Sequence, residues 1–261
     1  MHSIKKYLPT FRLERTSSRQ VISSKIHSRD KKIDRMEKAK KPLRKGVINF
    51  LISYLDREIT YLEIGLRDPN DNFNHVNAKI KYSVDPGLEF EANPADFKIT
   101  SDEFFNGLRA GKLLNKDIKF DVIFIDGLHL AEQVDRDIEN SLKYIIDDGF
   151  IVLHDCNPPT EWHARENYHY IGTPVGASWN GTTWKGFMKW RFNSKVFSCC
   201  IDTDYGVGII SRKTDIGHAI APTNLFYEYH IFQENRIRYL NLIQFKDLEK
   251  KLKKQHKDNR N

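Results

Sequence analysis

Two histidines stand beside acidic residues in the middle of the chain, and this combination could carry proton transfer. Asp126 lies three residues before His129, and His154 directly precedes Asp155. An imidazole gains and loses a proton near neutral pH, so either histidine could act as a general base toward a hydroxyl group. We rank His129 above His154 as this base, with Asp126 as the supporting acid. The alternative for each histidine is a hydrogen-bonded structural role.

Four acidic residues, Glu63, Asp85, Asp126 and Asp155, stand at the ends of four short apolar runs. The runs cover residues 59–64, 82–85, 121–126 and 150–154, and their β-branched and aromatic side chains predict β-strands. Ligands of an open parallel sheet bind beyond the carboxyl ends of its strands. One such acid alone is often a helix cap, but four together predict a single cleft.

The order of the runs predicts an α/β fold. Apolar residues at helical spacing over 131–146 separate the third and fourth runs, which is typical of a strand-helix-strand crossover in a parallel sheet. Residues 195–201 and 206–210 predict two strands that are joined by a short turn and are therefore antiparallel. We expect a Rossmann-like, doubly wound, mainly parallel sheet with a C-terminal antiparallel hairpin, followed by helix over 224–254.

The composition restricts the class of protein. The chain has 261 residues, of which 39% are hydrophobic and 30% charged, so it can form a folded core. No run approaches the roughly 20 apolar residues of a membrane-spanning helix, and residues 1–30 lack the apolar centre of a secretory signal. The three cysteines, Cys156, Cys199 and Cys200, do not suit a disulfide framework or a spaced zinc site. We expect a soluble, cytoplasmic protein without a transmembrane segment.

The net charge of +7 belongs to the two ends of the chain. Residues 1–50 carry +11 and residues 246–261 carry +4, whereas residues 51–245 carry −8. Residues 1–45 form a basic N-terminal arm, which we interpret as a peripheral helical lead-in; a docking surface for phosphate-bearing partners or a cleaved targeting peptide are the alternatives. Residues 216–261 form a helical, basic C-terminal tail. The acidic middle disfavours nucleic acid as a partner.

Five stretches, taken in order, resemble the class I S-adenosylmethionine-dependent methyltransferases. They are residues 61–65, 83–87, 101–105, 124–129 and 149–155, and the last two match the Ile-Asp-Gly-x-His and Leu-His-Asp segments of a small-molecule and sugar O-methyltransferase-like branch. The resemblance runs from about residue 59 to residue 210. It implies a methyltransferase domain over 46–215 that uses S-adenosyl-L-methionine as its cofactor.

The resemblance also assigns roles to individual residues. The implied cofactor-binding residues are Glu63, Gly65, Asp85, Ser101, Asp102 and Asp126. A glycine at position 65 lets the backbone approach a ligand closely, and a carboxylate at position 85 could accept hydrogen bonds from both ribose hydroxyls. The chain departs from the fuller Gly-x-Gly-x-Gly loop of the family, because Leu66 and Arg67 follow Gly65.

A divalent metal ion is the second implied cofactor. In relatives that use a metal, acids from these two strand ends hold the ion, and Asp126 and Asp155 match them, with Asn157 as a further oxygen ligand. Hard oxygen ligands suit Mg²⁺. We therefore expect a magnesium site at Asp126, Asp155 and Asn157.

Residues 158–192 form an aromatic insertion, which we expect to bind the substrate. Its segment 178–185 resembles a Trp-Asn-Gly-x-x-Trp-Lys segment in relatives associated with bacterial glycan synthesis, and Trp179, Asn180 and Trp184 are the candidate contacts. Aromatic faces with neighbouring polar groups suit a sugar. The alternative for Trp184, Phe187 and Met188 is packing in the core, because their spacing is helical.

These observations predict a methyltransferase that methylates a hydroxyl group of a sugar, a glycan precursor or a similar hydroxylated small molecule. The first alternative is a nucleic-acid methyltransferase that uses the basic ends to hold phosphates. The second is an inactive methyltransferase fold that serves as a binding module. The sequence leaves the oligomeric state open, a homo-oligomer included.

Overall fold

The computed structural model describes residues 24–89 and 92–258, so the first 23 residues of the predicted N-terminal arm lie outside the described part of the chain. Within it, one mixed sheet has the strand order β2-β1-β3-β4-β6-β5-β7. The strands are β1 (Thr60–Ile64), β2 (Ile80–Val84), β3 (Phe120–Ile125), β4 (Ile145–Leu153), β5 (Phe197–Ile201), β6 (Val207–Ser211) and β7 (Leu242–Ile243).

The first four strands are parallel to one another, and β6 is antiparallel to both β4 and β5. The predicted fold, a mainly parallel α/β sheet with a C-terminal antiparallel hairpin, is confirmed. All six residues of β3 are buried, which explains why five of them are apolar instead of alternating with polar residues; the sixth, Asp121, is paired with Arg57.

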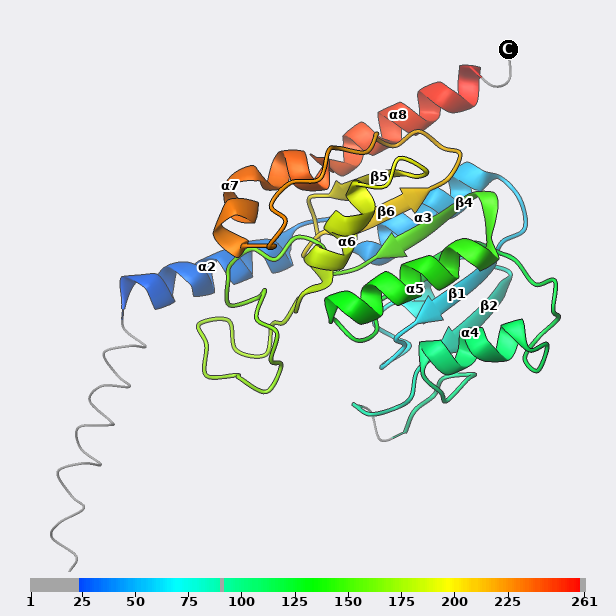
Figure 1. Ribbon diagram of the computed structural model, residues 1–261, viewed down its shortest axis with the longest axis horizontal. Coiled ribbons are helices and arrows are strands. Elements are labelled where there is room, and N and C mark those ends of the chain that lie inside the picture. The colour runs from blue at the N-terminus through cyan, green and yellow to red at the C-terminus, as the bar shows by residue number, and fades with distance from the viewer. Residues whose placement is uncertain (1–23, 90–91, 259–261) are drawn as a thin grey trace, which may run out of the picture.

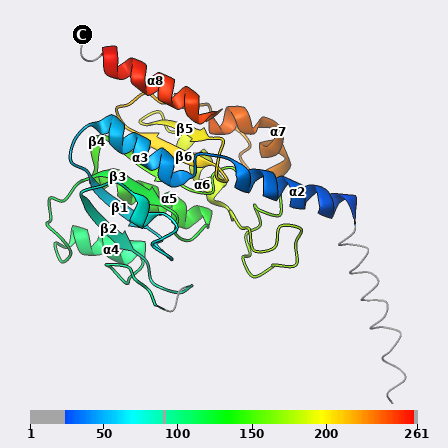
Figure 2. The same ribbon diagram turned by 180° about the vertical axis from the view of Figure 1, so that it is seen from behind.

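Helices cover both faces of the sheet (Figures 1 and 2). One face carries α4 (Ser101–Arg109), α5 (Ala131–Tyr144), α6 (Thr183–Arg191) and α7 (Tyr229–Leu240), and the other carries α3 (Arg44–Leu55) and α8 (Phe245–Asp258). The short η1 (Phe73–His75) follows β1. The buried apolar residues accordingly fall into two clusters, one on each face. No helix in the described ranges is both long and apolar enough to cross a membrane.

The basic arm contains α2 (Lys25–Ala39), whose buried face is acidic. Asp30, Asp34 and Glu37 are buried, although the helix as a whole is polar. Asp34 Oδ1 accepts hydrogen bonds from His163 Nε2 at 3.1 Å and from the Tyr205 hydroxyl at 2.8 Å. The helix is therefore attached to the domain by polar contacts.

The tail differs from the single helix that was expected over 224–254. Helix α7 ends at Leu240, and its C-cap residue Asn241 has a left-handed backbone with φ of 46°. The next two residues form β7, in which Leu242 and Ile243 pair with Cys200 and Ile201 of β5. Helix α8 follows and buries Leu248 and Leu252 against the sheet face that α3 also covers. The sequence pattern missed β7 because two residues are too short for a recognisable strand period.

Candidate active site

A cavity of about 650 Å³ opens at the carboxyl ends of the parallel strands. All four predicted strand-end acids, Glu63, Asp85, Asp126 and Asp155, line it. Parallel strands end on the same edge of a sheet, so residues that are far apart in the sequence meet there. The expected single cleft is present.

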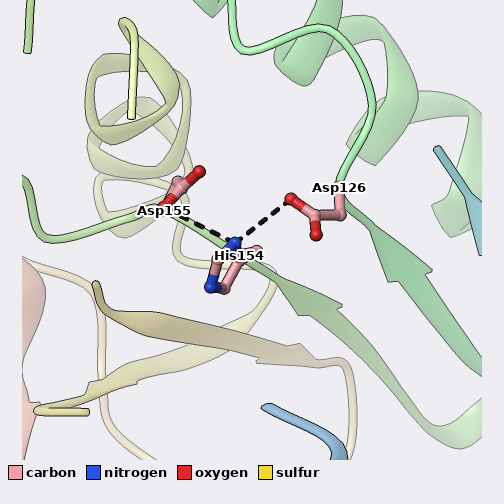
Figure 3. Close-up of side chains that lie close together, drawn as sticks. All are labelled: Asp126, His154 and Asp155. Atoms are coloured by element: carbon pink, nitrogen blue, oxygen red, sulfur yellow. Dashed lines mark hydrogen bonds and ion pairs between the residues drawn. The ribbon is translucent and has the colours of Figure 1, made fainter. Parts of the chain in front are cut away.

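At the centre of the cavity, Asp126 and Asp155 share two histidines. His129 Nε2 lies 3.2 Å from Asp126 Oδ1, and His129 Nδ1 lies 3.2 Å from Asp155 Oδ2. His154 Nδ1 lies 3.2 Å from Asp126 Oδ1 and 3.5 Å from Asp155 Oδ1, so that this imidazole bridges the two carboxylates (Figure 3).

Arg44 and Asp204 extend this charged cluster. The Arg44 guanidinium lies 3.6 Å from Asp126 Oδ2 and 3.2 Å from Asp204 Oδ2, and the Arg44 backbone N–H also donates to Asp204. Asp204 Oδ1 lies 3.5 Å from His154 Nε2. Three carboxylates thus face one guanidinium and two imidazoles, and the charges balance when both imidazoles are protonated.

Burial and charge act in opposite directions on both histidines. Burial disfavours the charged imidazole, but the carboxylates of Asp155 and Asp126 outweigh burial and raise the pKa of His129 and that of His154. Burial likewise opposes ionisation of Asp126, whereas the two histidines and Arg44 hold its pKa well below the ordinary value. His129 is consequently a stronger proton acceptor than a free imidazole.

The backbone is unusual where these side chains are positioned. Asp155, Asp204 and Tyr205 have φ values of 61°, 47° and 62°, in the left-handed region that is uncommon for residues other than glycine. Such conformations cluster at functional sites, where neighbouring contacts hold them in place.

Gly65 and Gly181 are each needed at close contacts beside the cavity. A Cβ atom on Gly65 would lie 2.2 Å from the backbone oxygen of Asp126, and one on Gly181 would lie 2.2 Å from the backbone oxygen of His129. Both glycines also have positive φ, at 87° and 59°. A side chain at either position would displace a residue of the charged cluster.

Asp85 stands at the β2 end of the cavity with acceptor capacity to spare. Its two carboxylate oxygens accept the backbone N–H groups of Arg67 at 2.9 Å and Gly87 at 2.7 Å. Each oxygen keeps a further lone pair, so the side chain can still accept two ligand hydroxyls. Leu88 and Leu128 line the same cavity with 88% and 54% of their surface exposed, which provides apolar contact area for a ligand.

Glu63 is buried in the floor of the cavity. Its Oε2 accepts hydrogen bonds from the Tyr61 hydroxyl at 2.6 Å and from Asn72 Nδ2 at 2.8 Å. Burial raises the pKa of Glu63 to about 7, although both hydrogen bonds oppose the rise. The partners fix this carboxyl group in one orientation.

The aromatic insertion forms one wall of the cavity. The Trp179 ring stacks on His129 with centroids 5.1 Å apart, and the Trp179 backbone oxygen lies 3.0 Å from His129 Nδ1. Asn180 Nδ2 donates to Asp155 Oδ1 at 2.9 Å. Tyr168 packs against Trp179 and lines the same space. The insertion therefore orients both the candidate base and one acid.

Three predicted site residues lie elsewhere. Asp102 is on the surface of α4, where it pairs with Arg136, while its neighbours Thr100 and Ser101 line the cavity. The structure does not bring Asn157 into the cavity lining, because its Oδ1 accepts from Arg236 at 2.6 Å. Trp184 is 1% exposed and packs on Phe232, as the core alternative expected, and it lines a second cavity.

Several residues of the cavity were not foreseen from the sequence. They are Lys38, Arg44, Asn72, Gln133, Asp137 and Tyr205. Asp204 was not foreseen either; it is not part of the cavity lining, but it belongs to the charged cluster through its contact with Arg44. No local pattern marks Arg44 or Lys38, since both lie in the basic arm. Asp204 and Tyr205 belong to the predicted turn between the hairpin strands, and an acidic turn beside a cleft was the available signal.

The donor set at the centre fits a divalent cation. Asp126, His154 and Asp155 each offer one ligand atom, and these atoms lie within 4.8 Å of one another. The two carboxylates suit Mg²⁺, and an added imidazole suits Mn²⁺ and other first-row metals as well. Binding a cation there would displace the imidazole protons that now face the carboxylates.

Comparison with known proteins gives one family match. Residues 62–156, from β1 to just after β4, match the family described as a methyltransferase domain. No curated protein matches the sequence.

Three solved structures are similar at a low level. The O-methyltransferase from Bacillus cereus with SAH has 14% identity and a TM-score of 0.40, with coverage of 76% of this chain and 94% of that one. The O-methyltransferase TomG from Streptomyces achromogenes with SAM has 12% identity, a TM-score of 0.40 and coverage of 73% and 90%. The MycE methyltransferase with Mg, SAH and mycinamycin VI has 14% identity, a TM-score of 0.38 and coverage of 66% and 49%. Values this low transfer no substrate or residue role to this chain.

Proposed function

We propose that this chain, part of which matches a methyltransferase domain, is an S-adenosylmethionine-dependent methyltransferase. We propose further that it methylates a hydroxyl group of a sugar, a glycan precursor or a similar hydroxylated small molecule. The observation that carries the proposal is the joint lining of one cavity by the strand-end acids, by both histidines and by the aromatic wall. A cavity of about 650 Å³ has room for a cofactor and the reacting end of a small acceptor.

The cofactor half of the cavity is the part around β1 and β2. Asp85 accepts ribose hydroxyls with its free lone pairs, and Gly65, Ser101, Glu63 and Asp126 shape the rest of the binding surface. S-adenosylmethionine supplies a methyl group that is activated on a sulfonium. We leave Asp102 out of the cofactor site because its side chain pairs with Arg136 on the surface.

His129 is the proposed general base for the acceptor hydroxyl. Its stacking on Trp179 and its contacts to Asp126 and Asp155 hold the imidazole in one place. Only the neutral imidazole can take the hydroxyl proton, and the same two carboxylates stabilise the imidazolium that results. His154 positions the two acids. Trp179 and Asn180 face the acceptor, since both line the cavity beside His129.

Asp126 and Asp155, with His154, are the proposed ligands of a divalent cation such as Mg²⁺. A cation at this place would stabilise negative charge on an acceptor oxygen. Asn157 is not included, because Arg236 already engages its side-chain oxygen.

Calorimetry with S-adenosylhomocysteine, combined with a methyl-transfer assay on a panel of hydroxylated compounds, tests the proposal. Asp85→Ala should weaken binding about tenfold or more, because two hydrogen bonds to a charged group are lost. His129→Ala should leave binding unchanged and slow turnover by about 10² to 10⁴. Asp102→Ala is the matched control, next to the cavity but outside it, and should change neither.

Three outcomes would contradict the proposal or a part of it. A folded wild type that binds neither S-adenosylmethionine nor S-adenosylhomocysteine would remove the cofactor assignment. Binding without turnover on any hydroxylated compound would favour the inactive binding module instead. Equal loss of binding in both variants would refute the division of roles between Asp85 and His129.

A further inference from the structure

The side chains of α2 are separated by charge. All the basic residues of this helix are exposed, whereas its acids, Asp30, Asp34 and Glu37, are buried. The exposed basic residues are Lys25, Arg29, Lys31, Lys32, Arg35 and Lys38. The side of α2 that faces solvent is therefore cationic, and the proposed methyl transfer does not use it.

The buried acids neutralise only part of this charge. Arg29 pairs with Asp30 at 2.8 Å, and Lys38 pairs with Asp34 at 2.8 Å. The other basic side chains of the helix form no salt bridge with any residue that the structure describes; they are Lys25, Lys31, Lys32 and Arg35. Uncompensated cations on one exposed helix favour an anionic partner.

The outer face of α2 is accessible to an extended surface. Lys25, Arg29, Lys32 and Met36 follow one another at spacings of four, three and four residues, so they form one row along the helix. The buried acids form a second row, which is turned toward the domain. The N-terminal part of α2 projects beyond the sheet and the helices that cover it (Figures 1 and 2), which leaves the cationic row open to solvent.

Two large apolar side chains are exposed among these cations. Ile26 and Met36 keep 61% and 60% of their surface accessible. Ile26 directly follows Lys25, and Met36 stands in the cationic row itself. A single exposed apolar side chain is common, but apolar residues set among lysines and arginines on one helix are typical of helices that bind an anionic membrane surface.

Helix α8 is basic as well, yet it lacks this combination. Lys246, Lys250 and Lys254 are exposed and form no salt bridge within the described ranges, but α8 exposes no large apolar side chain over residues 245–256. Basic charge alone is what a solvated helix or a phosphate-binding face presents. A nucleic-acid backbone would engage the cations of α2 and leave Ile26 and Met36 unused. The apolar residues therefore favour a lipid surface.

We propose that α2 docks this protein on an anionic membrane surface. Lys25, Arg29 and Lys32 contact the anionic lipid headgroups, and Ile26 and Met36 enter the boundary between headgroups and acyl chains. Two apolar side chains contribute little area, so the docking is peripheral, reversible and sensitive to ionic strength. This interaction goes beyond the proposed methyl transfer and does not depend on it.

Co-sedimentation of the full chain with lipid vesicles tests the docking. Vesicles of equal parts of phosphatidylglycerol and phosphatidylcholine should bind the protein at least about tenfold more tightly than vesicles of phosphatidylcholine alone, because only the former attract the cations. Added sodium chloride should weaken the binding. Equal binding to both kinds of vesicle, or no binding to the anionic ones, would overturn the proposal.

The double variant Lys25→Gln, Lys32→Gln should weaken binding to the anionic vesicles by about tenfold or more, since two cations leave the contact. Lys250→Gln with Lys254→Gln in α8 is the matched control, because it changes the net charge equally at exposed positions on another helix. Equal weakening in both double variants would show that the total charge, and not α2, governs binding, which would contradict the assignment.

A second double variant, Ile26→Gln with Met36→Gln, distinguishes a membrane from nucleic acid. The net charge stays the same, and glutamine is a good helix former. Binding to the anionic vesicles should fall by about fivefold or more, whereas any binding of polyuridylate should not change. Unchanged vesicle binding would show that α2 recognises polyanions by charge alone and would remove the membrane assignment.

Hydrogen exchange in the presence of vesicles locates the contact. The anionic vesicles should slow backbone amide exchange in residues 25–39 of the wild type more than in residues 245–256. All the replaced side chains are exposed, so the variants should keep the circular dichroism of the wild type. Slower exchange that is confined to other parts of the chain would place the contact elsewhere and refute docking through α2.

Discussion

At the scale of single residues, Asp137 is a carboxyl group that the proposed methyl transfer does not use, although it lines the first cavity. It is 1% exposed within α5, lines the first cavity and accepts a hydrogen bond from Gln133 Nε2 at 3.0 Å. Burial raises its pKa from 3.8 to about 6, although hydrogen bonds from Ser101 and Gln133 oppose the rise. The folded protein therefore binds this proton more tightly than the unfolded chain does.

The sign of this shift sets a pH dependence of stability. Between about pH 4 and pH 6 the folded state carries more protons at this position than the unfolded state, so the free energy of unfolding falls as the pH rises through that window. Above about pH 6 the destabilisation caused by burying the ionised Asp137 no longer changes with pH. Asp137→Asn should remove this dependence and be more stable than the wild type by about 1 to 3 kcal/mol at pH 7.5, with little difference at pH 4.

Urea unfolding of both proteins from pH 4 to pH 7.5 measures the difference directly. An advantage of Asp137→Asn that does not grow with pH would show that the carboxyl group is not held in its neutral form.

The acids that were predicted from the sequence share one property, which is a position directly after a strand. Asp85, Asp126 and Asp155 follow apolar runs, so the sheet itself brings them together. Arg44 and Asp204 were not predictable, because their contact joins segments 160 residues apart and depends on how α3 packs. Asp102 was predicted to bind the cofactor together with Ser101, but only Ser101 lines the cavity, because adjacent side chains of a helix face different directions.

At the scale of elements, α2 shows how a basic segment can be anchored by its acids. Asp34 is an acceptor, so His163 must carry its proton on Nε2, and His163 Nδ1 then accepts from the Thr160 hydroxyl at 2.9 Å. Glu37 receives the backbone N–H of Tyr205 and pairs with Lys40. Because Tyr205 lines the first cavity, α2 and the site are connected through one side chain.

Asp34→Asn should loosen α2 without unfolding the domain. An asparagine Oδ1 can still accept from both His163 and Tyr205, but the two bonds lose their charge assistance and the ion pair of Oδ2 with Lys38 is lost. Backbone amide hydrogen exchange in residues 25–39 should therefore accelerate by about tenfold or more. Arg35→Gln, at an exposed position of the same helix, is the matched control. Equal exchange in both variants would exclude Asp34 as the anchor.

The same contact should weaken in acid. Burial lowers the pKa of His163, although Asp34 opposes the change. As the pH falls below about 6.5, protonation of His163 therefore favours the state in which α2 has detached and the imidazole is exposed. Exchange in α2, corrected for the intrinsic rate, should be faster at pH 5 than at pH 7.5.

The strands and α5 were predictable because their apolar periods are strong and local. The division of the tail into α7, β7 and α8 was not, since a left-handed Asn241 and a two-residue strand leave no period to detect. The contact of α2 escaped prediction for another reason. Its buried face is polar, so hydrophobic patterning gives no sign of it.

At the scale of the whole molecule, the three cysteines are distributed over the two apolar clusters, one on each face of the sheet. Cys199 packs in the cluster covered by α3 and α8, whereas Cys200 and Cys156 pack in the cluster on the other face. All three are free and fully buried, and burial raises the pKa of each thiol, that of Cys199 to about 12.

A thiol reagent such as DTNB should therefore label no cysteine rapidly in the native protein at pH 8 and three after unfolding in guanidinium. The slow native reaction should have the same rate for all three thiols, because each becomes accessible only when the core opens. Rapid labelling of one thiol by a protein with native circular dichroism would show that one layer opens independently.

The net charge illustrates what composition alone can and cannot tell. An excess of +7 would by itself suggest a polyanionic partner, yet the positive charge resides in the ends of the chain while the first cavity gathers carboxylates. Charge at this scale governs solubility and docking, whereas the chemistry depends on a few groups in one cavity.

The pairing of β7 with β5 has a consequence for synthesis on the ribosome. Strand β5 is complete at residue 201, but its outer edge stays open until residues 242 and 243 have emerged. An unpaired edge that contains Cys199, Cys200 and Ile201 is a template for pairing with other nascent chains. We therefore expect the nascent chain to be prone to edge pairing during this interval of about 40 residues.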